Sequence, residues 1–158
     1  MNDEERIKLL QATPFFGAAK PASIELLLNL SETQQMPAGD YFFRQGDRGD
    51  SLYLLEKGRA VIFKQWNNDE YPLRHVKDGD CFGELAMIDF SPRSASVRAE
   101  IDSTAIKIPS SALHALYQKD PEQFVIIQMN MAREVSRRLR ASDERWFRHQ
   151  LNSSFHID

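Results

Sequence analysis

The chain has 158 residues, a length typical of one domain with a buried core. Its composition, 42% hydrophobic and 27% charged, is that of an ordinary globular protein, and a net charge of −3 argues against general attraction to nucleic acid or an acidic membrane. The single cysteine, Cys81, excludes an internal disulfide and a four-cysteine metal site, and it fits a reducing compartment.

We expect no export signal at the N-terminus, because Met1–Arg6 is polar and mostly acidic. No apolar run in the chain approaches the roughly 18–20 residues that a membrane-spanning helix needs. We therefore expect a cytoplasmic protein without a membrane segment.

Residues 1–33 are predicted to form two short helices. The first spans roughly Glu4–Ala12 and ends at Thr13-Pro14, because proline disfavours helix in the residue before it. The second begins near Pro21 and carries apolar residues along one face.

Residues 34–109 are predicted to form short strands joined by tight turns. Six of the seven glycines lie between residues 39 and 83, where they separate short apolar runs, and Asn67-Asn68-Asp69 is predicted to be a hairpin tip. Many strands without helices between them favour an antiparallel β-roll, either a barrel or a jelly roll. The expected strands are Tyr41–Arg44, Ser51–Glu56, Ala60–Gln65, Tyr71–Val76, Ser94–Ala99 and Thr104–Ile108. The side chains expected to face the interior of the roll are Leu54, Val61, Phe63, Leu73 and Val97.

From Ser110 onward the pattern becomes helical again. Ser110–Lys119 is predicted to be a short helix, and Asp120-Pro121 is predicted to begin a long one that runs to about His149. No repeat or linker divides the chain. We therefore predict one domain over residues 1–158, with N-terminal helices in 1–33, the β-roll in 34–109 and C-terminal helices in 110–150.

The stretch Phe82–Ala99, F-G-E-L-A-M-I-D-F-S-P-R-S-A-S-V-R-A, places Glu84 and Arg93 in an otherwise apolar setting. Taken alone, the two residues fit an exposed carboxylate and its surface partner, a common pair of little energetic worth. However, Gly83 and the small residues after Arg93 leave room beside the charged groups. A guanidinium and the start of a short helix at Glu84–Asp89 can bind a phosphate, and a carboxylate can accept a hydrogen bond from a sugar hydroxyl. The second interpretation is therefore a ribose-phosphate pocket.

The segments F-G-E-L-A and P-R-S-A-S-V closely resemble the phosphate-binding cassette of cyclic nucleotide-binding domains, here residues 82–97. This family includes the catabolite activator, protein kinase regulatory subunits and cyclic-nucleotide-gated channels. Ala38–Lys64 is similar to the glycine-punctuated first half of the family's roll, and the resemblance covers roughly residues 15–140.

The resemblance implies roles for the cassette residues. Glu84 would accept the ribose 2′-hydroxyl, and Arg93 would pair with the cyclic phosphate. The residues whose backbone N–H groups would help to line the pocket are Gly83, Leu85, Ala86 and Ala95.

Ser94 follows the arginine at a position where family members carry Ala, Thr or Ser. Its hydroxyl could contact the phosphate or the 2-amino group of guanine. The ligand is therefore expected to be cAMP or cGMP, and only the prevalence of cAMP within the family favours cAMP.

The long helix carries an apolar stripe that is too long to pack only on its own domain. About thirty residues span ~45 Å, more than the width of a compact domain of this size. We expect Phe124–Met131 to pack on the roll, and Leu139–Trp146 to lie in a homodimer seam away from the ligand pocket. The arginines of this helix are expected to form mainly a solvated face, with partner binding as the alternative; they are Arg133, Arg137, Arg138, Arg140, Arg145 and Arg148.

The remaining features concern DNA binding, enzyme activity and the way in which the domain would signal. In the activators a helix-turn-helix domain follows the long helix, whereas Leu151–Asp158 is too short for one, so we expect no DNA binding. The four histidines (His75, His114, His149 and His156) are scattered, unlike the clustered ligands of metal-dependent cupin enzymes. We therefore expect no enzyme activity, metal or cofactor. The leading hypothesis is a cyclic nucleotide sensor that signals through its C-terminal helix to an unidentified partner; the alternative is an interaction module that has lost its ligand.

Overall fold

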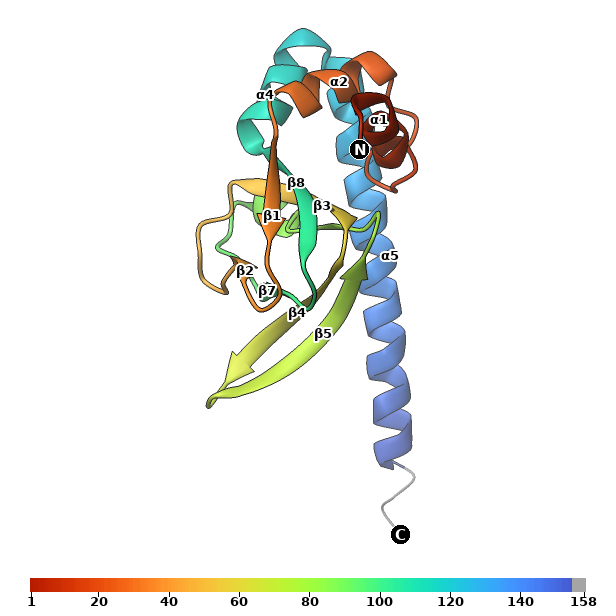
Figure 1. The fold of residues 1–158 in the computed structure, drawn as a ribbon. Helices are drawn as coiled ribbons and strands as arrows, with labels where there is room; N and C mark the ends of the chain where they lie inside the picture. Colours follow the sequence, from red (N-terminus) through yellow and green to blue (C-terminus); the bar gives the residue numbers. More distant parts are fainter. Residues whose placement is uncertain (155–158) are drawn as a thin grey trace.

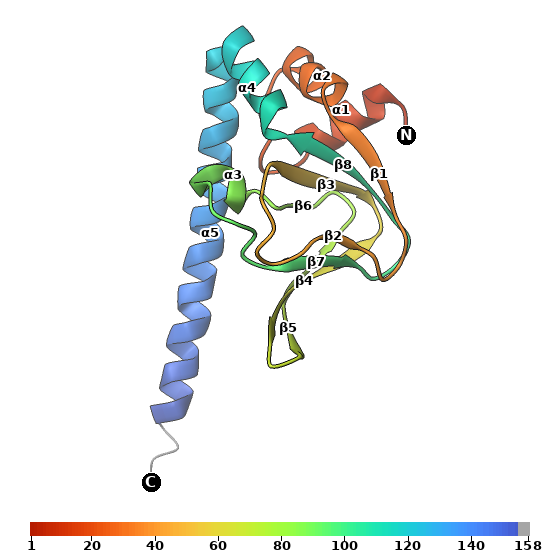
Figure 2. The same cartoon turned by 90° about the vertical axis from the view of Figure 1, so that its left-hand side faces the viewer.

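The computed structural model of the chain describes residues 1–154; residues 155–158, which include His156, lie outside the described part. A β-roll forms the body of the molecule, a group of helices covers one end of it, and the last helix runs along its side and continues beyond it (Figure 1). The view from the side shows that this long helix faces one flank of the roll, near a short helix from the middle of the chain (Figure 2). The structure confirms the predicted fold class, which is mainly antiparallel β-structure flanked by helices.

The described residues form five helices, each of which begins within about two residues of its predicted start. The N-terminal helix is closed by a capping box, in which the Asn2 side chain accepts a hydrogen bond from the Glu5 N–H at 2.8 Å. The last helix begins as predicted, because Asp120 Oδ1 accepts a hydrogen bond from the Gln123 N–H at 3.3 Å. The helices are α1 (Asp3–Gln11), α2 (Pro21–Asn29), α3 (Leu85–Asp89), α4 (Ser110–Lys119) and α5 (Pro121–Ser154).

Two four-stranded antiparallel sheets form the roll. The first has the order β1 (Glu32–Met36), β8 (Ser103–Pro109), β3 (Ser51–Lys57) and β6 (Cys81–Phe82). The second has the order β2 (Tyr41–Phe43), β7 (Ser96–Ala99), β4 (Arg59–Trp66) and β5 (Asp69–Lys77). Strands β1 and β6 were not expected from the sequence, because β1 is polar except for its last residue, Met36, and β6 has only two residues.

The hairpin between β4 and β5 turns where the sequence predicts. Asn67 and Asn68 both adopt left-handed backbone conformations, with φ of 50° and 67°. Such a pair of residues matches the right-handed twist of the flanking strands. Asparagine tolerates this conformation better than most side chains, which explains the choice of residues at the tip.

A β-bulge interrupts the same hairpin nearer the roll. Ile62 lies opposite Arg74, whereas the next residue, Phe63, lies opposite Pro72, so Leu73 is an extra residue in β5. The prediction that Leu73 faces the interior of the roll is wrong, because its side chain is 57% exposed. The bulge breaks the alternation on which that prediction relied.

Two apolar clusters hold the fold together. One lies inside the roll and is rich in aromatic side chains, such as the stacked Tyr53 and Phe82 rings with centroids 5.1 Å apart. The other joins β3 and β8 to the helices and contains Ile127 and Met131 of α5. The first turns of α5 therefore pack on the chain's own domain as predicted. Much of the surface that they contact is formed by the other helices as well as by the roll.

The distal half of α5 has no such cover among the described residues. The Leu139 and Trp146 side chains are 60% and 61% exposed. Within residues 1–154, no helix is long and apolar enough to cross a membrane.

Candidate functional site

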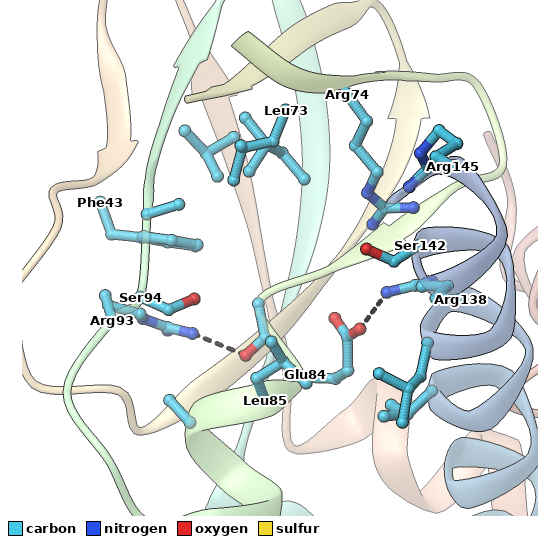
Figure 3. Close-up of a pocket in the computed structure, with 17 residues that line it drawn as sticks. Phe43, Leu73, Arg74, Glu84, Leu85, Arg93, Ser94, Arg138, Ser142 and Arg145 are labelled. Atoms are coloured by element: carbon cyan, nitrogen blue, oxygen red, sulfur yellow. Dashed lines mark hydrogen bonds and ion pairs between the residues drawn. The ribbon is translucent and has the colours of Figure 1, made fainter. Parts of the chain in front are cut away.

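A pocket of about 400 Å³ lies between the cassette, the β4–β5 hairpin and α5 (Figure 3). This volume is in the range of small-molecule binding sites. All seven residues that the sequence nominated line it. The lining residues from the cassette are Gly83, Glu84, Leu85, Ala86, Arg93, Ser94, Ala95 and Val97.

Arg93 is buried at the floor of the pocket and is only 4% exposed. Its Nη1 donates to the Gly83 carbonyl at 2.6 Å, and its Nη2 donates to the Ser51 carbonyl at 2.7 Å. The guanidinium also lies over the Phe43 ring, 4.0 Å from the centroid. These contacts fix the orientation of the side chain without neutralising its charge.

The positive charge of Arg93 has no compensating carboxylate within ion-pairing distance in the described chain, and its buried Nε has no hydrogen-bond acceptor. Burial lowers the pKa of Arg93 from its usual value, because desolvation disfavours the charged form. A buried charge held in this way is costly unless an anion joins it.

Two glycines make room for this arrangement. Gly83 has φ of +81°, and a Cβ atom at that position would lie 2.9 Å from Arg93 Nη1. A Cβ atom on Gly49 would lie 2.1 Å from the Ala86 Cβ. Larger residues at either position would push the cassette away from the arginine.

Glu84 is also buried, with 2% of its surface exposed, and it forms an ion pair with Arg138 of α5. Arg138 Nε lies 3.4 Å from Glu134 Oε1, an ion-pair distance. The surface-pair interpretation is therefore wrong on both counts: Glu84 and Arg93 are not exposed, and they do not pair with each other. Figure 3 shows them on opposite sides of the Gly83 backbone, each held by a different partner.

Sequence reasoning missed the contribution of α5 to this pocket. Arg138 and Arg145 both line the pocket. Arg138 is half-buried, so the expectation that the arginines of α5 form mainly a solvated face is wrong at this position, whereas Arg145 is exposed. Leu139 lines it too, which corrects the expectation that the apolar seam and the pocket are separate. The spacing of Arg138, Ser142 and Arg145 places them on one helix face, and this polar stripe was the available signal.

The remaining arginines of α5 agree better with the prediction. Arg137 pairs with Glu134 at 3.3 Å, and Arg148 pairs with Glu144 at 3.2 Å. Arg140 is exposed. One more lining residue, Arg74 of β5, was not expected and reaches the pocket beside the bulge.

Comparison with known proteins agrees with this geometry. The family model described as "Cyclic nucleotide-binding domain" matches residues 33–120, more than half of the chain. The chain belongs to the cyclic nucleotide-binding domain family.

Relatives of this domain include eukaryotic and bacterial regulators. The cAMP-dependent protein kinase regulatory subunit of Emericella nidulans is 39% identical over 99 residues, which are 63% of this chain and 24% of that protein. The cyclic AMP receptor protein of Thermus thermophilus is 30% identical over 135 residues, 85% of this chain and 61% of that protein. The chain thus spans about a quarter of the kinase subunit and less than two thirds of the receptor protein.

The fold is also that of the family. A solved cyclic nucleotide-binding domain from Methylobacillus flagellatus has a TM-score of 0.79 with 25% identity, and the match covers 90% of this chain and 81% of that one. In residues 1–154 of the present domain, no group of three or more His, Cys, Asp or Glu side chains is placed to hold a metal ion.

Proposed function

We propose that this domain binds a purine 3′,5′-cyclic nucleotide, cAMP or cGMP, and acts as a regulatory sensor rather than an enzyme. The observation that carries the proposal is Arg93, a buried cation without an anionic partner at the floor of a pocket of ligand size. A cyclic phosphate carries one negative charge and several acceptor oxygens. It would satisfy both the charge and the unused Nε donor of Arg93.

The sugar would lie beside Glu84. Its carboxylate can accept a hydrogen bond from the ribose 2′-hydroxyl, while the ion pair with Arg138 holds the carboxylate in place. The N–H groups at the start of α3, from Leu85 and Ala86, have no partner within that helix and would face the phosphate. Gly83 and Ala95 would let the ligand approach the backbone closely.

Binding would be transmitted through α5. This helix contributes one wall of the pocket and continues well beyond it (Figure 1), so a ligand that changes the contacts of Arg138 would shift the helix as a body. The exposed Leu139 and Trp146 support pairing of the distal half with a second copy or another protein. The proposal includes a cytoplasmic location, which the single buried thiol of Cys81 supports.

Calorimetric titration with cAMP, cGMP and the acyclic control 5′-AMP tests the proposal. We expect saturable binding of at least one cyclic nucleotide, with 5′-AMP weaker because its phosphate is not bonded to O3′ and is therefore not fixed beside the ribose. If neither cyclic nucleotide binds, the chain is instead an interaction module that retains the fold without the ligand.

A further inference from the structure

The far half of the β4–β5 hairpin is an arm that projects from the roll (Figure 1). We define the arm as residues 64–73, all of which are exposed. Strand β7 pairs with β4 only as far as Phe63, so in the arm β4 and β5 pair with each other alone. A two-stranded ribbon without a third strand is only marginally stable. A further contact is therefore needed to keep the arm in one position.

The position of the arm matters for the pocket. Ile62, which directly precedes Phe63 and the arm in β4, lines the pocket, and so does Leu73, the bulge residue at the other end of the arm. These two side chains form the apolar wall that the hairpin contributes to the pocket. A displacement of the arm would therefore move this wall.

An ion pair on the other face of the sheet holds the arm. Val97 of β7 lines the pocket, and the next residue, Arg98, points to the opposite face because side chains alternate along a strand. The Nη1 and Nη2 atoms of Arg98 donate to the two carboxylate oxygens of Glu70 in the arm, both at 2.7 Å. Within residues 1–154, this pair is the one side-chain hydrogen bond or salt bridge between the arm and another part of the chain.

The roll fixes the Arg98 side chain for this contact. Its guanidinium lies over the rings of Phe63 and Tyr41, 4.7 and 5.6 Å from their centroids, and its Nη1 also donates to the Tyr41 hydroxyl at 3.2 Å. The hydrogen bond from Arg98 lowers the pKa of Glu70 from its usual value. Because the guanidinium is already oriented and contacts both carboxylate oxygens, this pair is stronger than an ordinary surface ion pair.

We propose that Arg98 and Glu70 are positioning residues, whose ion pair holds the arm against the roll and keeps the wall formed by Ile62 and Leu73 on a bound cyclic nucleotide. Neither residue lines the pocket. The part of this proposal that concerns ligand retention rests on the proposed function, whereas the hold on the arm is a property of the domain alone.

Hydrogen exchange of the ligand-free protein is the first test, because it reports local opening of the backbone. We expect Glu70→Gln to accelerate exchange of the paired amides in residues 64–73 by ~5-fold, the factor for an ion pair at the upper end of the exposed range. Exchange in β3 and β8 should not change. Asp69→Asn is the matched control, because Asp69 is an exposed carboxylate of the same arm without an ion-pair partner in residues 1–154. Unchanged exchange of the arm in Glu70→Gln would overturn the proposal.

Binding kinetics are the second test, measured by surface plasmon resonance with cAMP and with cGMP. We expect Glu70→Gln to raise the dissociation rate by ~5-fold and to change the association rate by less than ~2-fold, since a loosened wall retains the ligand less well. An unchanged dissociation rate would contradict the positioning role. Equal increases in both rates would also contradict it, because they would indicate a gate through which the ligand passes.

Variants of Arg98 separate the ion pair from a general effect of charge. Arg98→Lys should raise the dissociation rate less than Glu70→Gln does, since lysine keeps the charge but lacks the planar fork. In an Arg98→Met background, Glu70→Gln should have no further effect, because the interaction is already absent. If Glu70→Gln still accelerates dissociation in that background, the carboxylate acts without Arg98 and the assignment is wrong.

Failure of the proposed function is distinguishable from failure of this inference. If neither nucleotide binds, the retention role falls with the proposed function, and hydrogen exchange of the ligand-free domain still decides whether the ion pair holds the arm.

Discussion

At the scale of single residues, the site depends on two buried charged side chains that have different partners. Glu84 is already neutralised by Arg138, whereas Arg93 has only neutral acceptors and aromatic rings around it. A buried ion pair needs no further partner, but an uncompensated buried cation favours any anion that fits. Glu84 therefore already has an ionic partner within the protein, whereas Arg93 has none among the described residues.

Arg93→Ala is expected to weaken cyclic nucleotide binding strongly, because each hydrogen bond to a charged group contributes about 1.5–3 kcal/mol. Arg93→Lys should recover only part of the affinity, since lysine lacks the planar fork. Calorimetry measures both, with Arg48→Ala as a control that removes an exposed arginine of the neighbouring loop. Unchanged affinity in Arg93→Ala would show that the phosphate lies elsewhere.

Glu84→Ala is expected to weaken binding of the ribonucleotide by ~10- to 100-fold, the value of one charge-assisted hydrogen bond, and to affect the 2′-deoxy analogue little. The reason is that the proposed partner of the carboxylate, the 2′-hydroxyl, is absent from the analogue. Comparing the two ligands in one binding assay separates this role from a structural one. Equal penalties for both ligands would mean that Glu84 acts through the shape of the cassette or through Arg138.

At the scale of elements, α5 divides into two halves with different surroundings. Ile127 and Met131 are fully buried in the cluster that joins the helices to the roll, and Asn130 Nδ2 donates to the Gly17 carbonyl at 2.7 Å. Beyond Arg145, the last residue of α5 that lines the pocket, the helix continues past the cassette (Figure 2) and exposes large apolar groups. Since Leu139 also lines the pocket, only residues farther along α5 can test pairing without touching the ligand.

Trp146→Ser is expected to weaken homodimerisation. Burying one large apolar side chain contributes about 1.5–3 kcal/mol, and a two-fold dimer loses it twice, so the dissociation constant should rise by two orders of magnitude or more. Light scattering at tens of micromolar would report the change in mass. Trp66→Ser is the matched control, because Trp66 is equally large and 70% exposed at the hairpin tip. A wild-type protein that is already monomeric under these conditions would show that the distal half of α5 awaits a different partner.

At the scale of the whole molecule, the helical cluster and the roll are joined beside the pocket by β6. Cys81 lies in this strand, packs in the same cluster as Leu54 and Ile127, and has a carbonyl that accepts the hydrogen bond from Arg74. Strand β6 therefore contacts both the helical layer and the β4–β5 hairpin.

Cys81 provides a probe of this packing. Burial raises the pKa of its thiol to about 12, so the reactive thiolate is scarce near pH 8 and increases only as the pH approaches that value. We expect alkylation at pH 8 to be very slow in the native protein and fast in urea, where the pKa returns to about 8.5. Mass spectrometry follows the labelling. Rapid labelling of the native protein would mean that β6 opens readily from the core.

Much of the fold was predictable because its signals are local. Asn67-Asn68 forms the hairpin tip, and Asp120 caps α5, through contacts within a few residues of each other. The cassette is likewise contiguous, so its seven nominated residues could be identified together, and all seven line one pocket. The same locality explains the missed β1, whose polar sequence carries no alternation and which forms only by pairing with β8, some seventy residues away.

The sequence by itself determined the β-roll, the cassette and the long helix, since each depends on turn residues, caps and short-range patterns. Only the tertiary structure decided which residues outside the cassette line the pocket. Arg138 meets Glu84 across 54 positions of sequence, and Arg74 enters the pocket because one extra residue reverses the alternation of β5. Apart from the polar stripe on α5, neither contact leaves a signal in the neighbouring sequence. Each contact depends on where α5 and the β4–β5 hairpin lie relative to the roll, and packing across the whole domain fixes that position.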